Sequence, residues 1–128
     1  MAFTFKTLQS GNHMRIVVSG KITADDCIGS LEHVMYAPHN HFVSTALIDL
    51  RDATYEHGDK ADVIDVAKVL ETFHSMLKNN IAIVAMRSTL FYAEIFSSHV
   101  RAATNAGIRV FVDIAAAEAF CMPPSKIG

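Results

Sequence analysis

Residues 43–52, with the sequence V-S-T-A-L-I-D-L-R-D, begin as an apolar run rich in β-branched side chains and end in charges. The run does not alternate between apolar and polar positions, which is typical of a parallel strand buried on both faces. Asp49, Arg51 and Asp52 lie at its carboxyl end. In open α/β sheets this end faces the crevice in which ligands bind. The stretch therefore predicts both a central strand of the core and one side of a binding site.

Four further segments have the pattern of strands. Residues 3–8 alternate between apolar and polar side chains, residues 13–19 form a second run, and the turn-forming residues 9–12 separate them. This pair is expected to form an antiparallel hairpin, with the more polar first strand at the sheet edge. Residues 81–86 and 108–112 are apolar runs that predict two more buried strands.

Two helices in the first two thirds of the chain have clear signals. Thr23 and Asp26 are spaced as in a capping box, and the helix that they begin must end before Pro38. Residues 59–79 repeat apolar side chains at the i, i+3, i+4, i+7 spacing of an amphipathic helix. Both helices are expected to pack one apolar side against the sheet.

Two more helices complete the predicted order of elements. One runs from 89 to about 106, with Gly107 as the glycine that follows its last turn, and one runs from 114 to about 120. The order is β-β-α-β-α-β-α-β-α. Right-handed crossovers then give a mainly parallel α/β sheet with helices on both sides and one antiparallel N-terminal edge strand. No repeat or linker divides the chain, so we expect one domain over 1–122 and a short tail over 123–128.

Two sets of side chains are expected in the core. The strands are expected to bury Ala46, Leu47, Ile48, Ile83, Val84, Val110 and Val112. The helix that starts at 89 is expected to turn Tyr92, Ile95, Phe96, His99 and Ala103 toward the sheet. Both predictions follow from the periodicity of each element.

Composition narrows the class of protein. The chain has 128 residues, of which 51% are hydrophobic and 19% charged, so a core for one domain is available. Its net charge of -2 offers no basic field for nucleic acid. No signal peptide is visible, and no apolar run reaches the roughly 20 residues of a membrane-spanning helix. Cys27 and Cys121 do not form a disulfide framework, so we expect a reduced, cytoplasmic protein.

Four segments carry a resemblance to a known family. They are Gly20-Lys21-Ile22-Thr23 with Asp25-Asp26, Leu47-Ile48-Asp49-Leu50-Arg51, Ile81-Ala82-Ile83-Val84-Ala85, and Val110-Phe111-Val112-Asp113 with Glu118-Ala119. In this order they resemble the SpoIIAA-like family of the STAS superfamily, whose namesake is an anti-sigma-factor antagonist. The resemblance covers roughly residues 3–121. It implies a single STAS-like domain with its five strands in sequential order, and a non-catalytic module that docks proteins or binds small ligands and often dimerises.

One departure from the family concerns phosphorylation. Antagonists of the family carry an Asp-Ser-Ser-Gly-like turn after the strand that corresponds to 43–52, and a kinase phosphorylates a serine there. In this chain the connection 52–59 has no serine, and its hydroxyl groups belong to Thr54 and Tyr55. The resemblance therefore does not carry over a phosphorylation switch. The wider family also resembles folds that hold apolar lipids, which keeps an apolar ligand among the alternatives.

Two groups of side chains form the candidate binding site, because neighbouring parallel strands bring their carboxyl ends to one edge of the sheet. The polar group comprises Asp49, Arg51, Asp52, Tyr55 and His57. The aromatic group comprises Phe91, Tyr92 and Phe96. An amphipathic ligand would direct its polar head toward Arg51 and lay its apolar body across Phe91 and Phe96. The alternatives are a structural arginine–carboxylate pair and aromatic side chains that are simply exposed.

These features predict a non-catalytic, regulatory binding module that docks a partner protein or a small ligand beside 49–58 and the third helix. The alternative is a carrier or sensor of a small apolar or lipid-like ligand. A further alternative is a small hydrolase that uses Asp49, Asp52 and His57, although the common catalytic motifs are missing. No cofactor and no metal are expected, because the loop histidines lack ligand partners at a recognisable spacing.

Two further predictions concern contacts and reactivity. Val69 and Met76 widen the apolar stripe of the 59–79 helix beyond what one sheet face buries, so we expect a homodimer through them. We expect no nucleic acid and no transmembrane segment, and peripheral contact with a membrane stays open. Cys27, near a helix N-terminus, is either a thiol of lowered pKa or a small buried hydrophobe.

Overall fold

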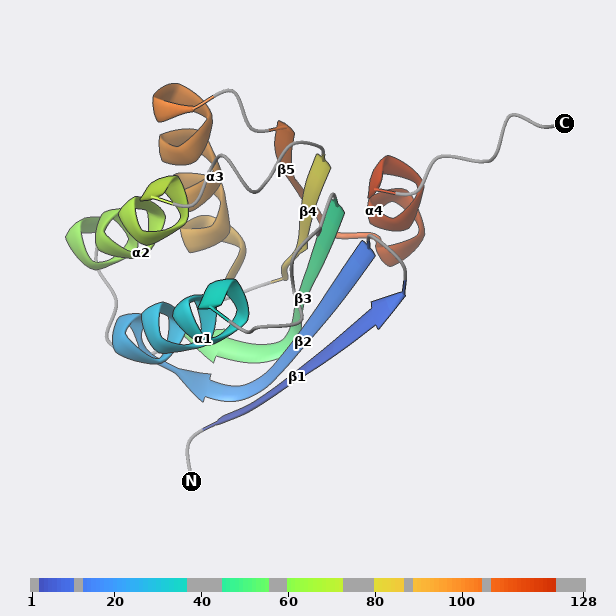
Figure 1. The fold of residues 1–128 in the computed structure, drawn as a ribbon, viewed down its shortest axis with the longest axis horizontal. Helices are drawn as coiled ribbons and strands as arrows, with labels where there is room; N and C mark the ends of the chain where they lie inside the picture. Colours follow the sequence, from blue (N-terminus) through green and yellow to red (C-terminus); the bar gives the residue numbers. More distant parts are fainter. Residues whose placement is uncertain are drawn as a thin grey trace, which may run out of the picture.

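The computed structural model describes residues 3–10, 13–36, 45–55, 60–72, 80–86, 89–104 and 107–121. The elements are β1 (Phe3–Ser10), β2 (His13–Ile22), α1 (Ala24–Tyr36), β3 (Thr45–Tyr55), α2 (Lys60–Thr72), β4 (Asn80–Val84), α3 (Leu90–Ala103), β5 (Gly107–Phe111) and α4 (Ile114–Cys121) (Figure 1). The predicted order of strands and helices is confirmed.

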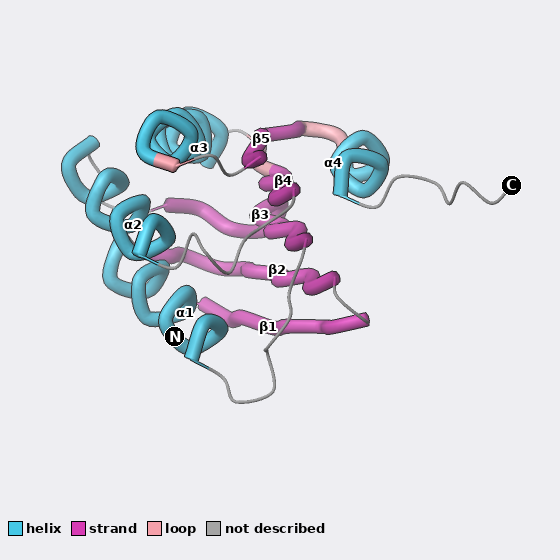
Figure 2. Tube along the Cα trace, turned by 45° about the horizontal axis from the view of Figure 1, so that its top comes forward, coloured by secondary structure: helices cyan, strands magenta, loops and turns pink. Residues whose placement is uncertain are grey.

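The strands form one sheet in the order β1-β2-β3-β4-β5. β1 pairs with β2 in the antiparallel direction, and the other neighbouring pairs are parallel. Helices α1, α2 and α3 cover one face of the sheet, and α4 lies against the other (Figure 2). The predicted fold class, an α/β domain with an antiparallel edge strand and helices on both sides, is confirmed.

The larger core lies between the sheet and the layer formed by α1, α2 and α3. The predicted apolar stripe of α2 supplies four of its buried side chains: Val63, Val66, Ala67 and Leu70. They pack with Ile81 and Ile83 of β4 and with Ile108 of the edge strand β5. Burial of a large aliphatic side chain contributes roughly 1.5–3 kcal/mol, so this layer supplies much of the stabilisation of the fold.

The opposite face of the sheet is covered only in part. α4 contacts β3, β4 and β5, and a second apolar cluster forms there from Leu47, Ala82, Val84, Ala117 and Cys121. On β2, every second residue from Met14 to Val18 is buried toward the helix layer, while the residues between them are half-buried. The central strands therefore show no polar alternation, whereas β2 alternates because its second face is less covered.

β3 extends beyond the predicted strand 43–52 and ends at Tyr55. The prediction that residues 52–59 form a connection is therefore wrong for residues 52–55, which pair with the end of β2. The partly covered face tolerates the polar side chains of this segment, and threonine and tyrosine suit a strand. Residues 56–59 lie outside the described part of the chain.

A β-bulge separates the two halves of β3. Val17 pairs with Asp49, and Ser19 pairs with Asp52, so β3 carries one more residue than β2 across this interval. The extra residue shifts the alternation of the strand. As a result Tyr55 packs on the same side of the sheet as α1 and α3.

The predicted strand core is confirmed for Ala46, Leu47, Ile83 and Val84, which are buried. Ile48 and Val110 are half-buried and pack against the larger core. The prediction for Val112 is wrong, because its exposed fraction is 60% and β5 ends at Phe111. Asp113 accepts hydrogen bonds from the backbone N–H groups of Ala115 (3.4 Å) and Ala116 (3.2 Å). This turn into α4 ends the strand before Val112.

The buried side of α3 consists of Ala93, Phe96, Ser97 and Val100. The predicted inner face is confirmed for Phe96, and Tyr92 and Ile95 are half-buried and pack against the larger core. His99 is only half-buried, and the prediction for Ala103 is wrong because it is exposed. Two small side chains on the buried side, Ala93 and Ser97, allow the helix to approach its neighbours closely, and hydrophobicity alone does not reveal them.

Gly107 does not follow the last turn of α3 as predicted, because α3 ends at Ala103 and Gly107 begins β5. The need for glycine at this position is one of space. A Cβ atom on Gly107 would lie 2.8 Å from Oδ1 of Asn80. The Nδ2 group of Asn80 donates a hydrogen bond to the carbonyl oxygen of Phe120 (2.8 Å), which holds that side chain beside Gly107.

Candidate functional site

An apolar cavity of about 120 Å³ lies between the sheet and the helices α1, α2 and α3. Side chains from β1 to β4 and from all three helices form its wall, and nearly all of the wall is apolar. Small residues of the helix layer, among them Cys27, Ser30 and Ala93, face the larger aliphatic side chains of the strands. An unfilled space with an apolar wall is uncommon in a packed protein and is typical of ligand pockets.

Three of the predicted site residues line this cavity: Tyr55, Tyr92 and Phe96. The rings of Tyr55 and Tyr92 are 4.7 Å apart between centroids, at an angle of 52°. The bulge in β3 makes this contact possible, because it turns Tyr55 toward α3. These aromatic side chains therefore lie in one place, as the sequence led us to expect, and their part in ligand binding stays a prediction.

Phe91 lies outside the cavity. Its ring contacts Tyr92 edge-on, with 5.4 Å between centroids, and its exposed fraction is 58%. One of the consecutive aromatic residues at the start of α3 therefore faces solvent, as the geometry of a helix requires.

The turn before α3 is fixed by Thr89, a buried residue that also lines the cavity. Its hydroxyl donates to the carbonyl oxygen of Met86 (3.1 Å) and accepts from the backbone N–H of Met86 (3.2 Å). The backbone N–H of Thr89 also donates to Met86 (3.2 Å). These bonds hold the start of α3 against the end of β4, beside the cavity.

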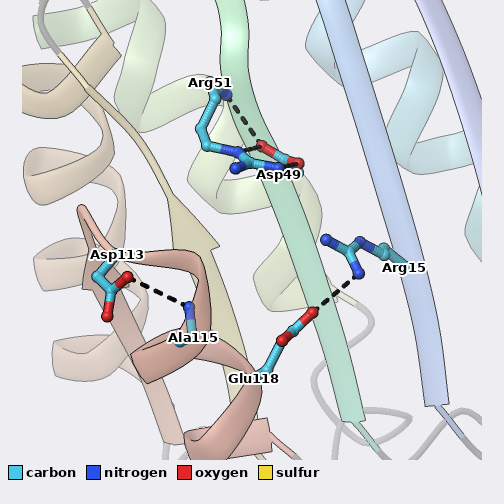
Figure 3. A network of polar contacts seen from close by, with 6 residues as sticks. All are labelled: Arg15, Asp49, Arg51, Asp113, Ala115 and Glu118. Carbon is cyan, nitrogen blue, oxygen red and sulfur yellow. Dashed lines mark hydrogen bonds and ion pairs between the residues drawn. The ribbon is translucent and has the colours of Figure 1, made fainter.

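The charged residues predicted for the site lie on the other face of the sheet. Asp49 accepts hydrogen bonds from Nε (2.9 Å) and Nη2 (2.8 Å) of Arg51 and from the Arg51 backbone N–H (3.1 Å) (Figure 3). Glu118 of α4 pairs with Arg15 at 3.0 Å in the same view. Arg51 and the cavity are therefore separated by the sheet, and one small ligand cannot contact both.

The environment of Asp49 favours the ionised carboxylate. Burial alone would raise its pKa, but the hydrogen bonds from the Arg51 side chain and backbone, with the charges of Arg51 and Arg15, bring the pKa below its ordinary value. A general acid needs the opposite change. The geometry therefore favours the structural arginine–carboxylate pair over a catalytic carboxylate.

Two other residues from the predictions, Asp52 and Val69, are described and do not line the cavity. Asp52 is an exposed residue of β3, and Val69 is a half-buried residue of α2. His57 and Met76 lie outside the described residues, so the hydrolase site and the dimer interface stay predictions. Within the part of the chain that the structure describes, no group of three or more His, Cys, Asp or Glu side chains could hold a metal ion.

Cys27 is a wall residue of the cavity and has the environment of a buried hydrophobe. Burial, and to a lesser extent the negative charge of Asp26, raise the pKa of its thiol to about 12. Of the two alternatives from the sequence, the thiol of lowered pKa is wrong. The sequence also gave no reason to place Asp26 at the site, although its capping-box spacing identified its position on α1.

Among the comparisons with known proteins, a solved structure supports this fold. No protein-family model matches the sequence, and no curated protein matches it. A crystal structure of an uncharacterized protein from the DUF3478 family, from Shewanella loihica PV-4, is described as having a SpoIIAA-like fold. It matches with 17% sequence identity and a TM-score of 0.55, and the match covers 94% of each chain.

Two predictions can be compared with these findings: the absence of a transmembrane segment and the SpoIIAA-like fold. Among the described helices, none has the length and apolar character needed to cross a membrane. The match extends over nearly the whole length of both chains, and the sheet order agrees with the predicted one. This chain has a SpoIIAA-like fold.

Proposed function

We propose that this protein is a non-catalytic binding module that holds a small apolar ligand in the cavity between the sheet and helices α1 to α3. The observation that supports the proposal is the cavity itself. Its wall is built from strands and helices and is nearly all apolar. Of the functions expected from the sequence, the carrier or sensor of an apolar ligand fits this site best.

The size and chemistry of the cavity support a compact ligand. Its volume is about 120 Å³. An engineered apolar cavity of about 150 Å³ in another protein stays dry and binds benzene, so a space of this order suits a single ring or a short aliphatic chain. Transfer of such a molecule from water is favoured by roughly 25 cal/mol for each Å² of apolar surface that is removed from water.

The aromatic side chains give the site a preferred ligand shape. Tyr55 and Tyr92 present tilted rings at one part of the wall, and the buried Phe96 is a further aromatic residue of the same wall. Aromatic rings favour offset or edge-on contacts with a second ring. A ligand with an aromatic ring could therefore add a third partner to the Tyr55–Tyr92 pair.

A variant that fills the cavity tests the proposal. Ala93→Leu places a larger side chain into the wall, and we expect it to weaken binding of toluene by at least about tenfold, equivalent to about 1.4 kcal/mol. Binding is measured from methyl NMR shifts of wall residues such as Leu50 and Val66. Ala102→Leu adds the same atoms to an exposed position of α3 and is expected to leave binding unchanged.

Two results would contradict the proposal. One is the absence of any toluene-dependent shift of the wall methyl groups in the unaltered protein. The other is equal binding by the Ala93→Leu and Ala102→Leu variants, which would place toluene outside the cavity. A thermal melt of each variant establishes that the substitution leaves the fold intact.

A second candidate function is docking of a partner protein, and the exposure of Phe91 favours it. Its exposed fraction is 58%, and nearby Met86 is also exposed at 37%. A photo-crosslinking residue at position 91 is expected to yield one discrete crosslinked species in host cells. The same residue in place of Ser98, an exposed position of α3, is the control. Equal yields from both positions would reject docking through Phe91.

A further inference from the structure

We infer that β1 pairs in the antiparallel direction with β1 of a second copy of this chain, so that two five-stranded sheets join into one continuous sheet. The two copies are then related by a two-fold axis perpendicular to the sheet. This inference is independent of the proposed ligand. It places the homodimer expected from the sequence at β1 and not at Val69 and Met76.

β1 is the outermost strand at one edge of the sheet (Figure 1, Figure 2). It pairs with β2 from Phe3 to Ser10 in one unbroken antiparallel register, and among the described strands no other pairs with it. In an edge strand, every second residue directs its backbone N–H and C=O groups away from the sheet. β1 therefore offers a regular row of backbone donors and acceptors to a further strand.

The other edge of the sheet, β5, is better protected. Nη1 of Arg101 in α3 donates a hydrogen bond to the carbonyl oxygen of Ile108 in β5 (2.9 Å), and α3 and α4 both contact this strand. Proteins commonly protect an edge strand with a covering helix, a proline, a bulge or charged side chains. β1 has no proline, its register with β2 contains no bulge, and its one charged residue is Lys6. β1 is thus the edge that is open to pairing.

The register between β1 and β2 shows which face of the sheet each side chain occupies. Lys6 and Leu8 are opposite Val17 and Arg15, and Arg15 bonds to Glu118 of α4. Lys6 and Leu8 therefore lie on the side of α4, and the residues between them point to the helix layer. The exposed fraction of Leu8 is 51%, which leaves an apolar side chain on this edge to be covered.

An axis through the exposed Thr7 gives the most favourable pairing of β1 with its copy. Thr7 then lies opposite Thr7 of the second copy, and Lys6 lies opposite Leu8. Threonine pairs stabilise neighbouring strands, and the aliphatic stem of lysine can cover leucine while its ammonium group stays in water. An axis through Lys6 would place two like charges opposite each other. An axis through Leu8 would leave fewer residues paired, because β1 ends at Ser10.

Helix α1 lies at the same edge of the molecule and is the least buried helix of its layer. The ring of His33, in its last turn, meets the ring of Phe5 on β1 edge-on, with 6.2 Å between centroids. No described side chain of α1 is fully buried, whereas α2, α3 and α4 each bury at least two. Because a perpendicular two-fold axis keeps both helix layers on one side of the joined sheet, α1 of the second copy would lie beside α1 of the first. Pairing of β1 thus gives α1 a second neighbour besides α2.

Sedimentation of the purified protein at micromolar concentrations tests the inference, and we expect a reversible dimer. Thr7→Lys places like charges opposite each other at the axis and should weaken the dimer at least about fivefold. Thr7→Glu should weaken it in the same way. An equimolar mixture of the two variants should restore the dimer, because each mixed dimer has opposite charges at the axis. Amide hydrogen exchange in β1 of the unaltered protein should become slower as the protein concentration rises.

Thr54→Lys is the matched control, because it makes the same change at an exposed threonine of β3. We expect it to leave the dimer unchanged, and a thermal melt of each variant establishes that the fold is intact. A protein that stays monomeric overturns the inference and leaves the edge to an extended segment of another protein. Equal weakening by Thr7→Lys and Thr54→Lys also overturns it, since the copies would then meet through another surface. So does a mixture of Thr7→Lys and Thr7→Glu that stays monomeric.

Discussion

Replacement of Leu47 by Ala is expected to lower the free energy of unfolding by about 2–5 kcal/mol, the range for a buried leucine that is truncated in a packed core. Leu47 has an exposed fraction of 0%. It lies in the second apolar cluster, between β3 and α4. The neighbouring side chains there include Ala82 and Ala117, which are too short to fill the space that leucine would leave.

Urea unfolding of the purified protein measures this change, and Leu8→Ala is the control. Leu8 lies on β1 with an exposed fraction of 51%. Its truncation should cost less than about 1 kcal/mol, because most of the side chain already contacts water. If the two variants lose equal stability, the packing of α4 against β3 is not a major contribution to the fold. A loss from Leu47→Ala that stays below about 1 kcal/mol would lead to the same conclusion.

The elements of this fold could be predicted because each one has a local pattern in the sequence. The stripe of α2 repeats with the period of a helix, and the capping pair Thr23 and Asp26 marks the start of α1. The apolar runs of β3 and β4 lack alternation because both faces of these strands are covered. Such signals need no knowledge of contacts between distant residues.

The predictions that the structure contradicts concern features that depend on contacts between residues far apart in the sequence. The bulge in β3 depends on the register between Val17 and Asp49 and between Ser19 and Asp52, which are far apart in the sequence. The buried side of α3 also includes two small side chains, Ala93 and Ser97, that fit against other elements and that the prediction left out. Hydrophobicity along one segment contains neither kind of information.

The aromatic part of the candidate site could be predicted from the sequence, but the position of its charged part could not. Tyr55, Tyr92 and Phe96 line one cavity, as the topology of a parallel sheet led us to expect. The faces of the central strand were not predictable, because a strand buried on both sides shows no polar alternation that would separate them. Asp49 and Arg51 consequently seemed to belong with the aromatic residues, whereas they lie on the side of α4 (Figure 3).

Asp49→Asn is the second substitution with a large expected effect. We expect it to lower the free energy of unfolding by about 1–2 kcal/mol at neutral pH. The carboxylate is 7% exposed, and the Arg51 side chain is 40% exposed. Hydrogen bonds to charged groups contribute about 1.5–3 kcal/mol when well formed, and the exposure of Arg51 places this pair at the lower end. The asparagine amide would also direct N–H groups toward the guanidinium, which has no acceptor.

The pH dependence of this effect follows from the lowered pKa of Asp49. A carboxyl group whose pKa is lower in the folded than in the unfolded state stabilises the fold fully above the unfolded pKa, about 3.9 for Asp. That stabilisation is lost as the pH falls through the folded pKa, because the proton then binds to both states. The stability difference between the unaltered protein and Asp49→Asn should therefore be constant near neutral pH and should shrink below about pH 4.

Urea unfolding at a series of pH values measures this difference. Asp52→Asn is the control, since Asp52 is exposed on the same strand and its replacement should change stability by less than about 0.5 kcal/mol. A difference for Asp49→Asn that stays constant into the acid range would mean that the stabilisation does not come from the ionised carboxylate. A loss equal to that of Asp52→Asn at neutral pH would mean that the Arg51 pair contributes little, and that Asp49 is free for another function on this face.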